Sequence, residues 1–205
     1  MSISVQTAIK SRVSINSFHP NRPLDDATIN SLVEMATKAP SAYNLQNWRF
    51  VVARSEEAKA RLQSAAYGQK KIADASAAFV ICGVLEAHKQ LPTALAPSIR
   101  AGIMPAAMAE TWQSQANQNH EGNAQLQRDE AVRSASLAGM TLMLAAQGIG
   151  LASCAMSGFD SAQIAQQFGL LNTELPVLVV AVGYPEPNNW PQKPRRHVSD
   201  VLTIV

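Results

Sequence analysis

Four separated segments of the chain carry side chains suited to holding an anion or the polar edge of a flat ring. In the first segment, Arg12, Ser14 and Asn16 alternate, so in an extended conformation all three side chains point to the same side. A guanidinium beside a hydroxyl can clamp a phosphate group. The same pattern also fits an ordinary surface arginine in a weak ion pair, and this segment alone leaves both interpretations open.

The second segment, residues 39–48, has the sequence APSAYNLQNW. The small residues Pro40, Ser41 and Ala42 would let the backbone approach a planar ring closely, and the amides of Asn44 and Gln46 could bond polar groups at its edge. The alternative is a helix end that leads into a strand, with the tryptophan in the core.

The third segment, residues 67–76, has the sequence YGQKKIADAS and directly precedes a predicted strand. Lys71 could stabilise negative charge on a bound ring, and Gln69 could pair with an amide-like edge. Adjacent lysines are also typical of a solvated surface, so this segment too is ambiguous when it is taken by itself.

The fourth segment, residues 148–160, has the sequence GIGLASCAMSGFD and ends at a predicted helix N-terminus. Backbone N–H groups in such a position favour negative charge, which makes Ser157 and Gly158 candidates for contact with an electron-rich ring atom. The alternative is a glycine-marked loop in which Phe159 packs as a hydrophobic staple.

Hydrophobic periodicity predicts the elements that must position these segments. Asp25, Ser55 and Asp160 are expected N-caps, and Pro40 is expected to stop the second helix. Buried strands are predicted at 48–53, 77–84 and 176–183, and helices at 5–10, 25–39, 55–66, 128–147 and 160–168. Helices alternating with three strands indicate an α+β or α/β sandwich with helices on a central sheet.

Two regions depart from a simple amphipathic pattern. Residues 88–127 contain several prolines and a tract rich in glutamine and asparagine, so we expect loose helices or a mobile, lid-like flap there. Residues 128–147 are apolar on almost every helical face over the last four turns. Such a helix should be buried all round, either in the core or in a subunit interface.

Composition limits the class of protein. The 205 residues, 47% of them hydrophobic, suffice for one domain spanning 1–205. A net charge of +2 without a long lysine or arginine run argues against nucleic acid as a partner. No window approaches the about 20 apolar residues of a membrane span, and no signal peptide is evident, so we expect a cytoplasmic protein. Cys82 and Cys154 lack CxxC spacing, and no metal site is predicted.

Taken together, the segments resemble the nitroreductase-like FMN-dependent oxidoreductase family over nearly the whole chain. The match rests on seven pieces in order: Arg12-x-Ser14, APSAYNLQNWRF at 39–50, GQKKIADAS at 68–76, LMLAAQGIG at 142–150, MSGFD at 156–160, VAVGYP at 180–185 and KPRR at 193–196. The resemblance implies a three-layer α/β/α sandwich with a mainly antiparallel sheet. It also implies an intertwined homodimer with two FMN sites at the subunit interface.

The resemblance assigns roles to particular residues. It implies that the phosphate and ribityl chain are held by Arg12, Ser14, Lys193 and Arg195. Gln69 and Lys71 would meet the pyrimidine edge of the ring. The backbone N–H groups of Ser157 and Gly158 would face N5 and O4. Pro40, Ser41, Ala42 and Asn44 would come from the partner subunit and pack against the ring. Val13, Asn16 and Met156 complete the predicted cofactor-binding set. Many family members carry lysine where Asn16 stands, so in this chain Lys71 alone would offset charge at N1, and the resemblance does not fix the flavin potential. Many also carry glutamate where Ser157 stands, a change expected to be tolerated because the implied bond comes from the main chain.

The activity implied is ping-pong transfer of reducing equivalents from NADH or NADPH through FMN to a small electron-poor acceptor such as a nitroaromatic or a quinone. No catalytic side chain is predicted, because the cofactor carries the chemistry. Three alternatives stay open: an FMN-binding protein without turnover, a dehalogenating or flavin-modifying branch of the same family, and a hydrolase that pairs Cys154 or a serine with one of the four histidines. The hydrolase would need an elbow such as GxSxG, which the sequence lacks.

Overall fold

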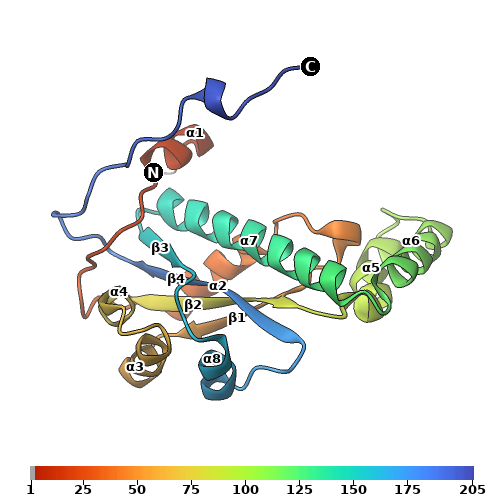
Figure 1. The fold of residues 1–205 in the computed structure, drawn as a ribbon, viewed down its shortest axis with the longest axis horizontal. Helices are drawn as coiled ribbons and strands as arrows, with labels where there is room; N and C mark the ends of the chain where they lie inside the picture. The colour runs from red at the N-terminus through yellow and green to blue at the C-terminus, as the bar shows by residue number, and fades with distance from the viewer. Residues whose placement is uncertain (1–2) are drawn as a thin grey trace.

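The computed structural model describes residues 3–205 and shows an antiparallel sheet between two layers of helices (Figure 1). The strands are β1 (Trp48–Ala53), β2 (Ala77–Val84), β3 (Ala152–Met156) and β4 (Glu174–Gly183), in the order β1-β2-β4-β3. All three neighbouring pairs are antiparallel. The predicted three-layer α+β fold is therefore confirmed.

The number of strands was predicted wrongly, because residues 3–205 form four strands and the sequence indicated three. β3 lies where only a short extended piece was expected. Its five residues, ASCAM, are mostly small and lack the β-branched run that marked β1 and β2. Pairing with β4 in a regular register from Ala152 opposite Gly183 to Met156 opposite Val179 makes this segment a strand.

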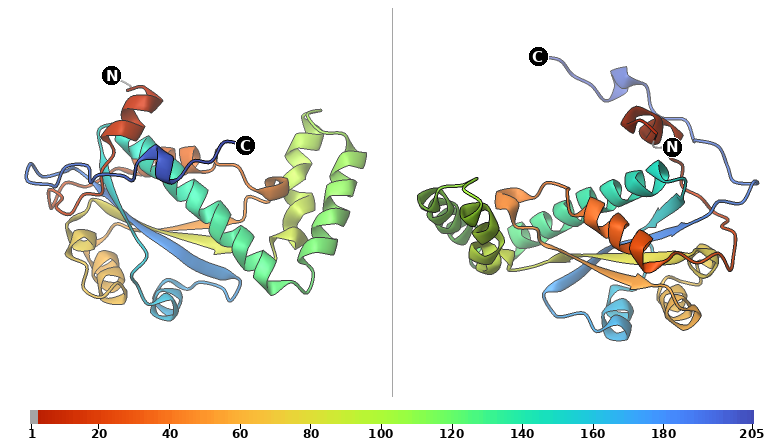
Figure 2. Two further views of the ribbon diagram at one scale, coloured as in Figure 1. Left: turned by 45° about the horizontal axis from the view of Figure 1, so that its top comes forward. Right: turned by 180° about the vertical axis from the view of Figure 1, so that it is seen from behind.

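Helices cover both faces of the sheet, as two further views show (Figure 2). The pleat divides β2 between two cores: Val80 and Cys82 pack toward one helical layer, and Phe79 and Ile81 toward the other. The first layer consists of α3 (Glu56–Ala65), α4 (Lys70–Asp74) and α8 (Ser161–Phe168); the second consists of α2 (Asp26–Ala36) and α7 (Ala124–Gly148), with α1 (Val5–Ser11) against the C-terminal end of α7.

Helix capping confirms the predicted starts of α2, α3 and α8. Side-chain oxygens of Asp25, Ser55 and Asp160 accept hydrogen bonds from backbone N–H groups three residues later, at 2.8, 3.1 and 3.0 Å. The hydrogen bonds from Thr28 hold the pKa of the Asp25 carboxyl below its ordinary value. α2 ends at Ala36, three residues before the predicted end, because the chain then forms a tight turn ahead of Pro40.

Helix α7 is the longest described element, with 25 residues, and it begins at Ala124, four residues before the predicted start at 128, with Asn123 as its N-cap. Its sheet-facing side is buried, and Gly83 of β2 lets its backbone approach closely. The outward side is not buried within one chain: Leu137 and Met140 are 40% and 38% exposed. The sheet can cover only one side of a helix, so burial of the other side by a partner subunit stays a prediction.

The region 88–127 is more regular than expected. After the 3₁₀ turn η2 (Ala87–Gln90), it forms α5 (Leu91–Arg100) and α6 (Ala106–His120), which pack against each other beyond one end of the sheet. Leu91, Leu95, Ala109 and Ala116 make a small core of their own there. Of the two alternatives predicted for this region, helices are therefore confirmed, and a lid-like role stays a prediction.

Candidate functional site

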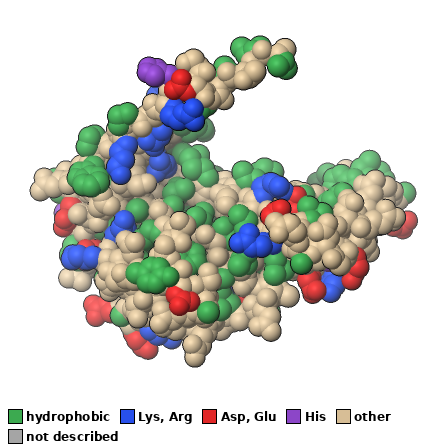
Figure 3. All heavy atoms as spheres, viewed as in Figure 1, with side chains coloured by type: hydrophobic (Ala, Val, Ile, Leu, Met, Phe, Trp, Pro, Cys, Tyr) green, Lys and Arg blue, Asp and Glu red, His purple; other side chains and the backbone are tan. Residues whose placement is uncertain are grey.

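A cavity of about 220 Å³ lies where β3, α4 and the C-terminal tail meet. Among residues 3–205, three cations line it, Lys71, Lys193 and Arg195, and no carboxylate does. The other lining residues are Val13, Ser14, Asn16, Cys154, Trp190, Pro191 and Gln192. Lysine and arginine side chains gather along the first part of the projecting tail and on the body beside it (Figure 3). This donor set fits an anionic ligand that also offers groups for a hydroxyl and an amide.

The first wall is the extended segment after α1. Ser14 forms a parallel bridge with Ser153 of β3, and the N–H of Ile15 donates to the Ser153 carbonyl oxygen at 3.1 Å. Alternation then buries Ile15 in the core while Ser14 and Asn16 line the cavity. Arg12 is half-buried at the C-terminal end of α1 and does not line the cavity.

The second wall is the first turn of α4, which separates the two adjacent lysines. Lys70 points outward to Asp74, with Nζ 2.5 Å from the carboxylate, and this bond raises the pKa of Lys70. Lys71 points inward, with Nζ 3.3 Å from Asn16 Oδ1 and 3.6 Å from Cys154 Sγ. Consecutive helical residues differ by about 100° in direction, so only one of the pair can face the cavity.

The two cysteines have different surroundings. Cys82 is fully buried in β2, and burial raises the pKa of its thiol to about 12. Cys154, on β3, is also buried but lines the cavity next to Lys71. Sequence patterns did not distinguish the two, because both side chains face the same helical layer and differ only in the neighbours that cover them.

The third wall is the C-terminal tail after β4. Trp190 is 63% exposed, and Lys193 Nζ lies 5.1 Å from the centroid of its ring. Arg195 Nη1 donates to the carbonyl oxygen of Lys193 at 2.7 Å, which holds the two cations on one short segment. Sequence reasoning identified Lys193 and Arg195 but missed Trp190 and the asparagine before it.

The structure places the Pro40–Asn44 group elsewhere. Pro40, Ser41 and Ala42 line a separate cavity of about 270 Å³ against Glu130, Arg133, Ser134 and Leu137 of α7. Figure 1 shows the 3₁₀ turn η1 (Ala42–Asn44) near α6, at the opposite end of the molecule from α4 and β3. Ser134 precedes the end of α7 at Gly148 by about 21 Å along the helix axis, at 1.5 Å per residue. One chain therefore does not bring the two predicted groups together.

The turn at η1 has an unusual backbone. Tyr43, Asn44 and Gln46 all have positive φ values, of 52°, 57° and 48°. The hydroxyl of Ser41 accepts a hydrogen bond from the N–H of Gln46 at 2.9 Å and closes the turn. A residue other than glycine in this region costs free energy that neighbouring contacts must offset.

The remaining predicted residues do not line the cavity. Gln69 precedes α4 and is half-buried, and Met156 is buried at the end of β3. Ser157 and Gly158 are exposed in the loop between β3 and α8. Within residues 3–205, the backbone N–H groups of Ser157 and Gly158 donate to no other residue, which leaves both available to a ligand.

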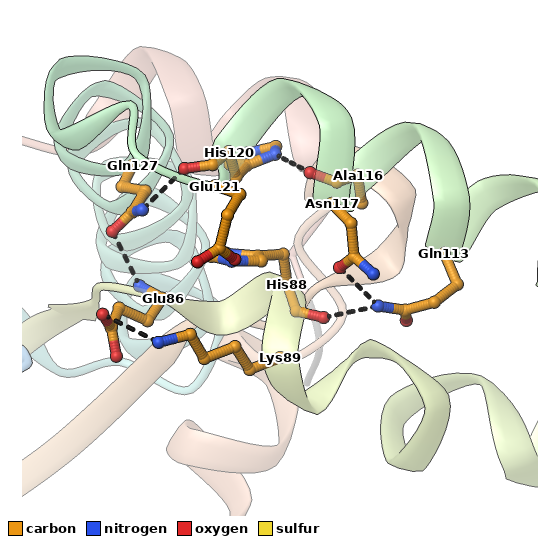
Figure 4. Close-up of polar contacts among 9 residues, drawn as sticks. All are labelled: Glu86, His88, Lys89, Gln113, Ala116, Asn117, His120, Glu121 and Gln127. Atoms are coloured by element: carbon orange, nitrogen blue, oxygen red, sulfur yellow. Dashed lines mark hydrogen bonds and ion pairs between the residues drawn. The ribbon is translucent and has the colours of Figure 1, made fainter.

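The region of residues 88–127 holds a buried histidine pair (Figure 4). The rings of His88 and His120 stack with centroids 5.6 Å apart, and the two residues are only 1% and 4% exposed. His88 Nε2 lies 3.1 Å from a Glu121 carboxylate oxygen, and His120 Nδ1 lies 2.9 Å from the Ala116 carbonyl oxygen. Amide side chains of Gln113 and Gln127 donate to the carbonyl oxygens of the two histidines.

This network also reaches the turn at η1. The ring of Tyr43 meets Trp112 edge to face at a centroid distance of 6.0 Å and His120 at 6.5 Å. Asn119 Nδ2 donates to the Tyr43 hydroxyl at 3.3 Å. α6 and the η1 turn are thereby joined by packing and hydrogen bonding. The histidine pair serves this joint, and no histidine lines the cavity that contains Cys154.

Residues 3–205 contain no group of three or more histidine, cysteine, aspartate or glutamate side chains that could hold a metal ion. In the same range, no helix combines the length and apolar character needed to cross a bilayer.

Comparison with known proteins gives concordant results. The model of the nitroreductase family matches residues 9–184. YodC of Bacillus subtilis, named as a candidate NAD(P)H nitroreductase, is 37% identical over 175 residues, which cover 85% of this chain and 86% of YodC. A crystal structure of a nitroreductase candidate from Exiguobacterium sibiricum in complex with FMN aligns with a TM-score of 0.90 at 28% identity, covering 100% of this chain and 99% of that one. YdfN of Bacillus subtilis, a further candidate nitroreductase, aligns with a TM-score of 0.91 at 26% identity over 98% of each chain.

Proposed function

Because this chain belongs to the nitroreductase family, we propose that it is an FMN-dependent NAD(P)H oxidoreductase that reduces small electron-poor acceptors such as nitroaromatics or quinones. The observation that carries the proposal is the cavity between α4, β3 and the tail, which three cations line without a carboxylate. FMN combines a phosphate with a ring whose pyrimidine edge accepts and donates hydrogen bonds, and the relative from Exiguobacterium sibiricum binds it.

The cavity residues divide by the part of FMN that each would hold. Lys193 and Arg195, with Arg12 and Ser14 nearby, offer charge-assisted hydrogen bonds to the phosphate. Lys71 would lie at the pyrimidine edge with Gln69, where its charge offsets the negative charge of a reduced ring. The free N–H groups of Ser157 and Gly158 would donate at the opposite edge.

FMN, once bound, would supply the redox chemistry by taking up a hydride from NADH or NADPH and reducing the acceptor in a second half-reaction. The chain contributes binding, orientation and exclusion of water. Lys71 holds its position through Asn16 and Cys154 and needs no proton transfer for this role. A cytoplasmic location belongs to the proposal because the nicotinamide donors are available there.

The proposal includes a homodimer, because the predicted ring-packing residues lie at the opposite end of the folded subunit from Lys71. These residues are Pro40, Ser41, Ala42 and Asn44. A twofold axis crossing α7 would place that group from one subunit over the cavity of the other. Two apolar surfaces support such a dimer. A groove of about 490 Å³ lies between α1, α2 and α7, and the tail projects from the body with exposed Val198, Val201, Leu202, Ile204 and Val205.

In the dimer, α5 and α6 of one subunit would lie near the ring held by the other. Nicotinamide and acceptor would bind there in turn, under the lid-like region. The contacts of Tyr43 with Trp112 and His120 give this region a firm attachment to the ring-packing turn. Between residues 91 and 127 the sequence has no tyrosine and no lysine, which favours simple reduction over the dehalogenating alternative.

The first test is spectroscopic. Purified protein reconstituted with FMN is expected to show flavin absorption bands that bleach under NADH or NADPH without oxygen and recover on addition of a quinone or nitroaromatic. Light scattering should give the mass of a dimer. Protein that cannot bind FMN would refute the proposal, and binding without bleaching by either nicotinamide would favour the alternative of a binding protein.

A matched pair of arginines tests the cavity itself. Arg195→Ala is expected to weaken FMN binding about tenfold or more, since a hydrogen bond to a charged group contributes roughly 1.5–3 kcal/mol. Arg196→Ala is the control, because Arg196 bonds the Asp200 carbonyl oxygen and does not line the cavity. Equal losses in the two variants would place the phosphate elsewhere.

A further inference from the structure

We infer that Asn189 is a positioning residue that fixes the tail cations at the cavity and thereby sets the affinity for the phosphate of FMN. The inference rests on the proposed function, because it needs FMN as the ligand. Asn189 does not line the cavity, and its side chain acts on the segments that do.

The side-chain amide of Asn189 makes four hydrogen bonds. Its Oδ1 accepts from the backbone N–H groups of Asn16 at 2.8 Å and Ser17 at 3.0 Å. Its Nδ2 donates to the carbonyl oxygens of Ser17 and Glu186, both at 2.8 Å. Two acceptor sites and two N–H groups are the full capacity of a carboxamide, so the structure uses all of it.

Beyond Asn189, little holds the tail in place. All residues from 191 to 205 are exposed, and within the described chain no hydrogen bond joins residues 190–205 to residues 3–189. Asn189 is thus the last point of attachment before Trp190, Lys193 and Arg195 reach the cavity. A chain segment without such an attachment keeps its conformational entropy and samples positions away from the site.

Asn189 joins the tail to the opposite wall. One of the two backbone N–H groups that donate to it belongs to Asn16, and the Oδ1 of Asn16 lies 3.3 Å from Lys71 Nζ. The segment after α1 keeps its own attachment to β3 through the Ser14–Ser153 bridge and the N–H of Ile15, so loss of the Asn189 side chain frees the tail and leaves Asn16 and Lys71 in place. Lys71, Lys193 and Arg195 repel one another, so the tail cations need a neutral attachment to stay close before an anion arrives.

Two ligands and two adjacent asparagines test the inference. FMN and riboflavin share the ring, and only FMN carries the phosphate. Asn189→Ala is expected to raise the Kd for FMN about tenfold or more, while the Kd for riboflavin changes less than twofold. Asn188→Ala is the matched control, since Asn188 is exposed and forms no hydrogen bond within residues 3–205. Both constants come from quenching of flavin fluorescence in titrations of the apoprotein.

A second background identifies the route of the effect. In the Lys193→Ala/Arg195→Ala variant, adding Asn189→Ala should weaken FMN binding less than twofold further, because the groups that Asn189 positions are gone. The dependence of the FMN Kd on salt should also be flatter for Asn189→Ala than for the wild type. If Asn189→Ala does not fold, judged by circular dichroism, Asn189→Ser replaces it with the same thresholds.

Three results would overturn the inference while leaving the proposed function intact. These are an FMN affinity within twofold of the wild type, equal losses for FMN and riboflavin, and a further tenfold loss in the background without Lys193 and Arg195. Wild-type protein that binds neither flavin would instead refute the proposed function.

Discussion

Gly83→Ala tests whether the close approach of α7 to the sheet sets the geometry of the molecule. A Cβ built on Gly83 would lie 2.4 Å from the carbonyl oxygen of Ala131, 2.6 Å from its carbonyl carbon and 2.8 Å from its Cβ. Two of the three contacts are with backbone, so no side-chain rotation relieves them. To reach ordinary contact near 3.4 Å, α7 must move by about 1 Å.

The cost follows from what that movement separates. Ala131, Ala135, Ala138 and Leu142 lie along the buried side of α7 with no exposed surface, and they lose contact with the sheet together. Overpacking a close-packed interior costs about 1–3 kcal/mol, and a clash with backbone belongs at the upper end. We expect Gly83→Ala to lower the free energy of unfolding by about 3 kcal/mol. The midpoint temperature should fall by about 6–12 °C for a chain of this size.

Urea unfolding of the apoprotein followed by circular dichroism, at one protein concentration, measures the effect. Gly139→Ala is the control on α7 itself, where the nearest atoms are flexible side-chain ends, Leu178 Cδ1 at 3.0 Å and Ile81 Cδ1 at 3.3 Å. Alanine also gains about 1 kcal/mol of helix propensity there, so this variant should stay within about 1 kcal/mol of the wild type. Equal stability of Gly83→Ala and wild type would refute the close approach of α7 to β2.

Two further predictions concern titratable groups. At pH 8 a small thiol reagent should modify Cys154, which lines the cavity, and spare Cys82, whose pKa of about 12 keeps its thiol protonated. Bound FMN should protect Cys154 from the reagent. Mass spectrometry locates the label, and fast labelling of Cys82 would contradict its burial in the core. Asp25→Asn should lower the free energy of unfolding at pH 7. Because the folded-state pKa of Asp25 is depressed below 3.8, the difference in free energy of unfolding between wild type and Asp25→Asn should vanish as the pH falls through that folded-state pKa. A difference that grows on acidification would contradict the stabilising role of the ionised Asp25 carboxylate.

Local signals predicted much of the fold. The runs WRFVVA and AAFVICGV gave β1 and β2 their observed bounds, because continuous β-branched and aromatic residues between turn signals leave little choice of element. The caps at Asp25, Ser55 and Asp160 were also predicted from local sequence, because a capping side-chain oxygen bonds backbone three residues away and needs no distant partner. β3 and α4 were missed because five residues are too few to show a period.

The candidate site was predictable only in part. The order of motifs indicated Ser14, Asn16, Lys71, Lys193 and Arg195, and the structure places all five around one cavity. No pattern indicated Asn189, because an asparagine after two prolines reads as an ordinary turn residue and its four partners are set by how the tail crosses residues 16 and 17.

The sequence by itself determined the residue types that suit an anionic ring ligand, the helix caps and the apolar runs, since these depend on neighbours along the chain. Only the tertiary structure decided that Lys71 faces the cavity while Lys70 faces solvent, that Cys154 and not Cys82 lies beside it, and that Pro40–Ala42 lies at the far end of α7. The physical reason is that direction and proximity arise from packing. The burial of Ile72 in the core orients α4, and the contact of Gly83 with Ala131 places α7. The residues that meet in these contacts are far apart in the sequence, so no local motif contains both.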